Sequence, residues 1–283
     1  MKFFVLGARG MAGHVVAQYL KEQGHQVVGY ARQPSPVCET VVGDAFETDK
    51  LKSEIVKGGF DVVVNCIGIL NKAVDSNLAT GVFVNSYFPH YVAQCCDSCG
   101  CRLIHISSDC VFSGKAAGYA ERDIPDESSY YGRTKFLGEV ILRPHLSFRT
   151  SIVGPELKES GIGLFNWFMH QKDDVHGYAH VMWSGVTTMV LAKAVLAASE
   201  QKISGLYYLS NNVGISKYEL LKLFNHFCNK DRRYIIKSEE PINSKVLVCT
   251  RTDFDYNVPS YEDMVKEMSD WIMGHQSIYG QYV

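Results

Sequence analysis

The strongest constraint on how this chain can fold lies in its first thirty residues. An apolar run, Lys2 to Leu6, is followed by a Gly-x-x-Gly-x-x-Gly motif and a second apolar run, Gln26 to Tyr30. We expect a buried strand, a helix from Met11 to Gln23, and a second strand. Glycines between a strand and a helix allow a tight turn and let backbone N–H groups approach a pyrophosphate, which the helix N-terminus attracts. This order predicts a dinucleotide-binding α/β fold.

The alternation of strands and helices continues and predicts a doubly wound, parallel Rossmann sheet. Further strands are expected at residues 41–44, 60–65, 102–106, 146–149 and 205–210, and further helices at 84–96, 187–199 and 264–275. The alternation fades after residue 155. We therefore expect residues 1–155 to form the cofactor-binding domain. Residues 156–283 should form a smaller, mainly substrate-binding portion, with some segments returning to the sheet.

The end of the second expected strand indicates which dinucleotide binds. Proteins that prefer NAD usually carry an acidic residue there, whereas this chain has Arg32, with Arg9 in the glycine loop. Because a guanidinium suits a 2′-phosphate, we expect NADP(H), with NAD(H) as the alternative. The other expected cofactor contacts are Gly7, Gly10, Met11, Gly13, Asp44, Ala45, Asn65, Cys66, Ile67, Gly68, Asn85 and Ile106.

Three side chains predict the chemistry. Ser108 follows the strand expected at 102–106, and Tyr131 and Lys135 stand at i and i+4 on one face of a helix. An unperturbed phenol titrates near ~10, and a nearby ammonium favours the phenolate, so we expect Lys135 to lower the pKa of Tyr131. Tyr131 would exchange a proton, and Ser108 would hold a substrate oxygen. Tyr131 and Lys135 are also expected to contact the cofactor.

The same Tyr-x-x-x-Lys spacing occurs again at Tyr218 and Lys222. No serine-bearing strand stands just before that amphipathic segment, so we predict surface structure there. The polar loop 113–129, between the serine strand and the tyrosine helix, is expected to act as a lid.

Composition argues against several classes of function. With 28 basic and 30 acidic residues and a formal charge of −2, the chain offers no broad attraction for nucleic acid or an anionic membrane. The first apolar run is too short for a signal peptide, and no stretch approaches a membrane span, so we expect a cytoplasmic protein. Nine cysteines, an odd number, are then expected to be reduced thiols.

Four of the cysteines lie close together in the sequence, at Cys95, Cys96, Cys99 and Cys101. Thiolates at short spacing suit zinc. However, the first two belong to an expected helix and the last precedes a strand, so their sulfurs should point in different directions. We therefore expect packing thiols and no metal site.

With these residues, the chain resembles the extended short-chain dehydrogenase/reductases, and among them the dTDP-4-dehydrorhamnose reductase group, over nearly its whole length. The matching strings are Gly7-x-x-Gly10-x-x-Gly13, His105 to Gly114, Tyr131 to Lys135 with Gly138-Glu139, and Arg149-Thr150-Ser151. The resemblance implies a 4-keto-6-deoxy sugar nucleotide that receives a hydride from NADPH at C4 and a proton from Tyr131. Lys135 would also hold the nicotinamide ribose, and the pathway would be synthesis of dTDP-rhamnose or another polysaccharide precursor.

The substrate contacts expected in this chain are Ser108, Asp109, Val111, Phe112, Tyr131, Arg149, Ser151 and Trp183. Two departures from the group's pattern leave the sugar and the nucleotide open. Ile152 stands where an aromatic residue is usual, and residues 65–72 differ from the usual alanine-rich sequence. In related dehydratases Asp and Glu follow the hydroxyl residue, whereas Cys110 follows Asp109 here, which argues against a dehydratase.

Three other functions stay open at this point. The first is a reductase of a UDP-2-acetamido-2,6-dideoxy-4-hexulose, and the second is a sugar-nucleotide epimerase that retains tightly bound NAD. The third, from a different class, is a non-catalytic protein that senses NADP(H). The superfamily commonly pairs through long surface helices, which implies a homodimer.

Overall fold

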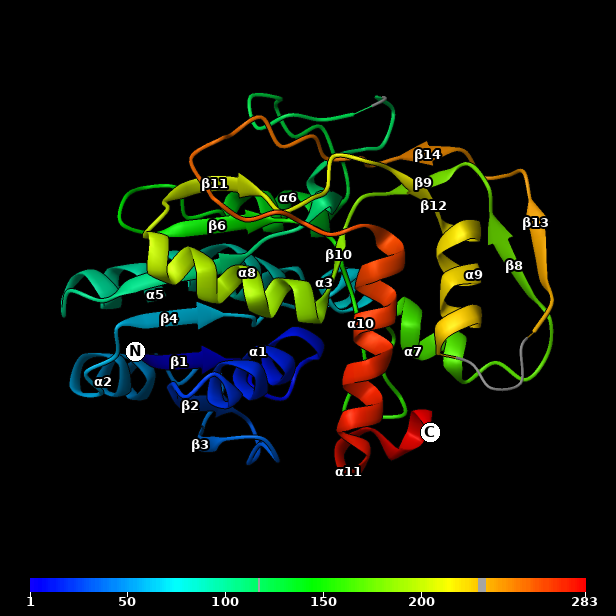
Figure 1. Cartoon of the computed structure of the whole chain (residues 1–283). Coiled ribbons are helices and arrows are strands. Elements are labelled where there is room, and N and C mark those ends of the chain that lie inside the picture. Colours follow the sequence, from blue (N-terminus) through cyan, green and yellow to red (C-terminus); the bar gives the residue numbers. More distant parts are fainter. Residues whose placement is uncertain (117, 229–232) are drawn as a thin grey trace.

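The structure is a computed structural model that describes residues 1–116, 118–228 and 233–283. Its main sheet contains the strands β1 (Lys2–Leu6), β2 (Gln26–Ala31), β3 (Glu39–Val42), β4 (Val62–Asn65), β5 (Arg102–Ile106), β6 (Leu146–Arg149) and β11 (Gly205–Tyr208). These seven strands are parallel and lie in the order β11-β6-β5-β4-β1-β2-β3 (Figure 1). The predicted doubly wound Rossmann sheet is confirmed, and its strand order reverses beside β1, where such folds bind ligands.

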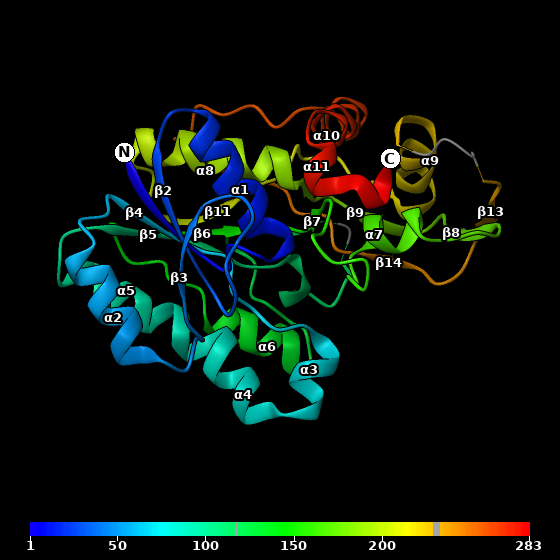
Figure 2. The same ribbon diagram turned by 90° about the horizontal axis from the view of Figure 1, so that it is seen from below.

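Helices cover both faces of this sheet (Figure 2). One face carries α1 (Met11–Glu22) and α8 (Thr188–Gln201), which pack on each other. The other face carries α2 (Thr48–Lys57), α3 (Asn71–Ser76), α4 (Leu78–Val82), α5 (Phe88–Asp97) and α6 (Tyr130–Leu137). No helix in the described ranges has the length and apolar character needed to span a membrane.

Strand β1 shows why the sheet forms. Its alternate side chains enter different apolar clusters: Phe3 and Val5 lie in the cluster under α1 and α8, and Phe4 and Leu6 lie in the cluster under α2 and α5. All four are fully buried. A strand covered on both faces needs a continuous apolar sequence, and this explains the unbroken run after Lys2.

The second portion of the chain builds a smaller structure beside the C-terminal ends of the main strands. Its elements are β7 (Ile152–Val153), α7 (Leu164–Met169), β8 (Val175–Tyr178), β9 (Val181–Trp183), β10 (Val186–Thr187), β12 (Ile215–Ser216), α9 (Lys217–Phe227), β13 (Ile235–Ser238), β14 (Asn243–Ser244), α10 (Tyr261–Gly274) and α11 (Gln276–Tyr279). The strands pair as β10-β7, β12-β9-β14 and β13-β8. Helix α10 contacts both α8 and α9, which joins the two parts.

The helix expected at 84–96 differs from the prediction. It begins with a π-helical turn, Phe83–Tyr87, and continues as α5, with Pro89 near its start. The π turn buries Asn85 and Ser86 against α6, where the Ser86 hydroxyl donates to the Thr134 carbonyl at 2.8 Å. Tertiary hydrogen bonds, invisible in a periodic pattern, thus support the irregular turn.

Candidate active site

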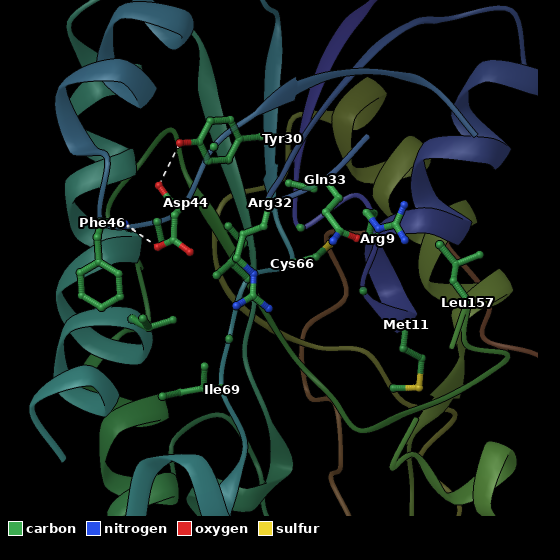
Figure 3. A pocket seen from close by; sticks show the side chains of 18 of the residues that line it. Arg9, Met11, Tyr30, Arg32, Gln33, Asp44, Phe46, Cys66, Ile69 and Leu157 are labelled. Atoms are coloured by element: carbon green, nitrogen blue, oxygen red, sulfur yellow. Dashed lines mark hydrogen bonds between the residues drawn. The ribbon is translucent and has the colours of Figure 1, made fainter. Parts of the chain in front are cut away.

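A cavity of about 710 Å³ opens at the C-terminal ends of β1, β2 and β4 (Figure 3). Ten of the residues predicted to contact the cofactor line it: Gly7, Arg9, Gly10, Met11, Arg32, Asp44, Ala45, Cys66, Ile67 and Gly68. The prediction missed others: Tyr30, Ala31, Gln33, Gly43, Phe46, Ile69, Thr80, Val84, Glu156, Leu157 and Lys158. Several of these neighbour predicted residues, but Glu156 to Lys158 come from the second portion, and no motif marks them.

The glycine turn has the shape that a pyrophosphate needs. Gly7 has φ +83, a conformation that glycine adopts readily, and its N–H donates to the Tyr30 carbonyl at 2.8 Å. A Cβ at Gly13 would lie 2.2 Å from the Gly7 carbonyl oxygen, so only glycine lets α1 approach β1 this closely. Gly10 and Met11, at the start of α1, line the cavity, so the helix N-terminus lies where it can attract a pyrophosphate, and the residues fit a dinucleotide.

The two arginines of the loop region have different surroundings. The Arg9 guanidinium donates to the Pro34 carbonyl, which fixes it beside the cavity. The exposed Arg32 side chain extends into the cavity in Figure 3. Among the described residues it has no hydrogen bond or ion pair. Arg32 is thus a cation without a protein anion, placed where the ribose of a dinucleotide would lie after β2.

Asp44 lies across the cavity from Arg9 (Figure 3). One carboxylate oxygen accepts from the Phe46 N–H at 3.1 Å, and the Asp44 carbonyl accepts from the Tyr30 hydroxyl at 2.9 Å (Figure 3). The other carboxylate oxygen has no hydrogen bond among the described residues and can accept one from the cofactor, which Asp44 is expected to contact.

Four predicted cofactor contacts are not among the residues that line this cavity, and their contact with the cofactor stays a prediction. Asn65 is fully buried, with its amide oxygen accepting from the Ile67 N–H at 3.0 Å. Asn85 is 1% exposed and exchanges two 3.0 Å hydrogen bonds with the backbone of Ile69. Gly13 lets α1 pack closely against the glycine turn. The carbonyl of Ile106 accepts a hydrogen bond from Lys135. These residues hold the wall rather than form its surface.

Ser108, Tyr131 and Lys135 are brought together next to that wall. Ser129 caps α6 by accepting from the Gly132 N–H at 3.2 Å, which orients the helix. Lys135 donates to the Ile106 carbonyl at 2.9 Å, just before the serines. A Cβ placed on Gly68 would lie 3.8 Å from the Lys135 Nζ, so the ammonium reaches the cavity wall.

The electrostatics of this group differ in one respect from the prediction. Burial raises the pKa of Tyr131, and the neighbouring Cys110 acts in the same direction, while the Ser108 hydroxyl favours the phenolate. Burial lowers the pKa of Lys135 to about 8. Lys135 does not lower the pKa of Tyr131 here, because its ammonium turns toward Ile106. The phenol is consequently held protonated, as a proton donor requires.

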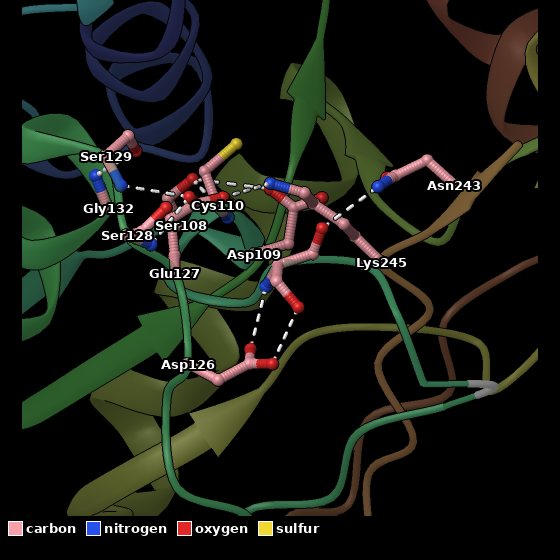
Figure 4. Close-up of polar contacts among 12 residues, drawn as sticks. Ser108, Asp109, Cys110, Asp126, Glu127, Ser128, Ser129, Gly132, Asn243 and Lys245 are labelled. Atoms are coloured by element: carbon pink, nitrogen blue, oxygen red, sulfur yellow. Dashed lines mark hydrogen bonds and ion pairs between the residues drawn. The ribbon is translucent and has the colours of Figure 1, made fainter. Parts of the chain in front are cut away.

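Asp109 and Cys110 adjoin the triad, and Lys245 reaches them from the second portion of the chain (Figure 4). Burial raises the pKa of the Asp109 carboxyl, and the Lys245 ammonium acts in the opposite direction. Lys245 also pairs with Glu127 at 3.2 Å. Sequence reasoning missed this lysine, since it lies 118 positions from its partner and in no motif.

The loop 113–129 is tied to the same second portion, and residue 117 within it lies outside the described residues. The Asn243 amide donates to the Ser113 carbonyl at 2.9 Å. Tyr119 exchanges backbone hydrogen bonds of 2.8 Å with Val246 and Val248. The predicted lid is therefore pinned by the segment after β14 in this structure.

Four of the predicted substrate contacts lie in the protein interior in this structure, and their contact with a substrate stays a prediction. Val111 and Phe112 are at most 1% exposed and form an apolar cluster with Tyr119. Trp183 packs against Tyr261 in the main core. Arg149 is 1% exposed, because Glu139 pairs with its guanidinium below the serines and Phe112 covers it.

The remaining predicted substrate contacts lie closer to the triad. Ser108 donates to the Asp109 carboxylate at 3.3 Å. Ser151 follows β6 and is half-buried, and its carbonyl accepts from the Val186 N–H at 2.8 Å. Ser108, Asp109, Tyr131 and Lys245 form a largely buried polar cluster after β5.

The features described so far define a Rossmann-fold protein with an acid–base group beside a dinucleotide-sized cavity. The comparison with protein families assigns the chain more specifically. A family described as the RmlD substrate binding domain matches residues 1–270, and the chain belongs to that family.

Individual relatives agree with this assignment. "Probable low-salt glycan biosynthesis reductase Agl14" of Haloferax volcanii is 35% identical over 147 residues, which is 50% of this chain and 49% of the relative, so the match spans about half of each. The dTDP-4-dehydrorhamnose reductase of Mycobacterium tuberculosis is 26% identical over 76% of this chain and 71% of its own. The dTDP-4-dehydrorhamnose reductase structure from Bacillus anthracis, solved with NADP, superposes with a TM-score of 0.80 at 16% identity, covering 94% of this chain and 98% of that one.

Proposed function

We propose that this protein reduces the 4-keto group of a nucleotide-linked 6-deoxy sugar with NADPH, as a short-chain dehydrogenase/reductase in the synthesis of dTDP-rhamnose or a related polysaccharide precursor. The observation that carries the proposal is the placement of Ser108, Tyr131 and Lys135 beside a glycine-lined cavity of about 710 Å³. The family and the dTDP-4-dehydrorhamnose reductases among the relatives support it.

The residues divide the reaction between them. The cofactor, when bound, supplies the hydride that adds to the carbonyl carbon. Ser108 donates a hydrogen bond to the carbonyl oxygen and fixes it near Tyr131. The protonated phenol of Tyr131 then gives its proton to that oxygen, which completes the alcohol. The Lys135 ammonium, at the cavity wall beside Gly68, would hold the ribose of the bound cofactor next to the reacting carbon.

Arg32 supports NADPH over NADH. A 2′-phosphate brings about two negative charges to the end of β2, where the free guanidinium can bind it bidentately. NADH has no such group and would leave Arg32 without a partner. An Arg32→Ala variant should raise the KM for NADPH more than the KM for NADH.

Cys110 argues against water elimination. Burial raises the pKa of this thiol to about 12, so it cannot exchange protons at neutral pH as a glutamate would. A dehydratase needs an acid–base pair at this place, and Asp109 alone does not supply one. The sugar is therefore expected to be reduced without loss of water.

The proposal is tested by following the absorbance of the reduced nicotinamide. NADPH and NADH are supplied separately with dTDP-4-keto-6-deoxyhexose and with UDP-2-acetamido-2,6-dideoxy-4-hexulose. Oxidation of NADPH with the dTDP sugar supports the proposal in full, and oxidation with the UDP sugar alone moves the substrate to the first alternative. Silence with both sugars despite NADPH binding would contradict a reductase and favour an epimerase or an NADP(H) sensor.

The two parts of the chain have separate roles in this proposal. Residues 1–155 bind the cofactor and carry the triad, and residues 156–283 mainly bind the sugar nucleotide. The protein would act in the cytoplasm, a reducing compartment, and all nine cysteines are free thiols in the structure, which agrees with that setting.

A homodimer is proposed from an exposed apolar surface beside α6. Leu137, Ile141 and Leu142 follow closely in the sequence and are 62%, 55% and 77% exposed. Such a patch is typical of an interface. Sedimentation velocity should show a dimer that Leu137→Glu converts to monomer. A monomeric native protein would contradict this part of the proposal.

A further inference from the structure

Four thiols gather between α5 and β5, at the edge of the sheet opposite the cavity. Cys95 and Cys96 lie in α5, Cys99 lies in the turn after it, and Cys101 directly precedes β5. Ser108 follows the other end of β5, so the thiols take no part in the reduction proposed above. Cys95, Cys96 and Cys101 are buried, whereas Cys99 is exposed.

Two of these sulfurs are already in contact. The Sγ atoms of Cys99 and Cys101 lie 3.5 Å apart. A disulfide needs about 2.0 Å, so the sulfurs must approach by roughly 1.5 Å. Gly100 between them has φ +76 and no atom within 4 Å of the position where a Cβ would stand. The turn therefore has space and backbone freedom for this small movement.

Cys99 and Cys101 differ in exposure and in thiol pKa, and this difference suits a reaction in two successive steps. Cys99 is exposed, whereas Cys101 is 5% exposed. Hydrogen bonds from the Cys96 thiol, and less strongly from Cys99, lower the pKa of Cys101 against the effect of burial. An external reagent thus meets Cys99 first, and Cys101 supplies a thiolate behind it.

We propose that Cys99 and Cys101 form a thiol–disulfide exchange site for small aliphatic disulfides such as glutathione disulfide. The sulfur of Cys99, as its proton passes to Cys101, attacks one sulfur of the external disulfide and breaks that S–S bond. The sulfur of Cys101 then attacks Cys99 in the mixed disulfide and expels the second glutathione thiolate. Two protein thiols are oxidised, one external disulfide is reduced, and the two protons end on the two released thiols.

The test uses the full chain, fully reduced and then incubated with glutathione disulfide. Remaining thiols are alkylated, and fragmentation of the tryptic peptide 73–102 locates the modified sulfurs. The wild type should lose two hydrogens, with the bond between Cys99 and Cys101. Cys101→Ser should instead retain one glutathionyl group on Cys99, because the second step is removed. Cys99→Ser should react at least ~tenfold more slowly in this peptide, because the exposed sulfur is gone.

Cys95→Ser is the matched control, because it removes a neighbouring buried thiol and should behave like the wild type. NADPH binding by each variant checks that the fold is intact, and Cys99→Ser carries its change on the surface. An unmodified wild type, a bond to Cys96, or equal reactivity of Cys99→Ser would each overturn the proposal.

Discussion

The chain contains the spacing Tyr-x-x-x-Lys twice, and the two copies have opposite environments. On α6, Tyr131 and Lys135 are 9% and 5% exposed. Burial raises the pKa of Tyr131 and lowers the pKa of Lys135, which favours the uncharged form of each side chain. On α9, Lys222 is exposed, pairs with Glu219 at 2.9 Å and lies 5.3 Å above the Tyr218 ring. The spacing fixes only that two side chains share a helix face. Burial and neighbouring groups decide whether that face can do acid–base chemistry.

The largest expected difference between the two regions concerns their carboxylates. Glu139 pairs with Arg149 in the interior below the triad, whereas Glu219 pairs with Lys222 in solvent. Glu139→Gln leaves a buried guanidinium without its anion and should lower the free energy of unfolding by about 3–5 kcal/mol. Glu219→Gln should change it by less than ~0.5 kcal/mol. Urea denaturation of both variants measures this. Equal losses would show that burial does not distinguish the two pairs.

The next difference is catalytic. Tyr131→Phe removes the proton donor and should reduce kcat/KM on the order of a hundredfold or more, with little change in NADPH binding. Tyr218→Phe is the matched control and should stay within about twofold of the wild type. Steady-state kinetics with the active sugar nucleotide gives both numbers. Full activity of Tyr131→Phe would remove the proposed mechanism.

A third difference concerns Lys245, whose ammonium acts on Asp109 and Cys110 next to the α6 pair. Lys245 lies between Glu127 and Asp109 in the polar cluster after β5, where the substrate is expected to bind. Lys245→Met should raise the KM for the sugar nucleotide about tenfold and change kcat little. Lys237, an exposed lysine paired with Glu239, provides the control variant Lys237→Met. A loss of kcat at unchanged KM would instead place Lys245 in the chemical step.

The sequence predicted the main parallel sheet and its helices well, because the strands of a doubly wound sheet are apolar throughout and glycines mark its first turn. It also placed Tyr131 and Lys135 on one helix face, since helical periodicity is local. It could not predict that Arg149 is buried, because the motifs that contain Glu139 and Arg149 do not show that these two side chains pair. The position of Lys245 beside Asp109 and Glu127 could not be predicted from the sequence either. Contacts between distant segments depend on packing, which no local motif reports.

The last difference is the pH dependence of stability. Burial lowers the pKa of Lys135 from 10.5 to about 8 in the folded protein. Between these values the unfolded chain holds a proton that the folded chain has lost, so this group makes the free energy of unfolding rise with pH. The rise should be about 1 kcal/mol per pH unit between pH 8 and ~9.5. It should be absent in Lys135→Met.

Lys222→Met is the control for this measurement. The hydrogen bond to Glu219 raises the pKa of Lys222 above 10.5, so both states keep its proton in the same window and the slope should not change. Titrations of all other groups occur in both variants and cancel in the difference. If Lys135→Met and Lys222→Met kept the same slope, the Lys135 ammonium would be as well solvated in the folded protein as Lys222. The acid–base role would then have to rest on Tyr131 and Ser108 alone.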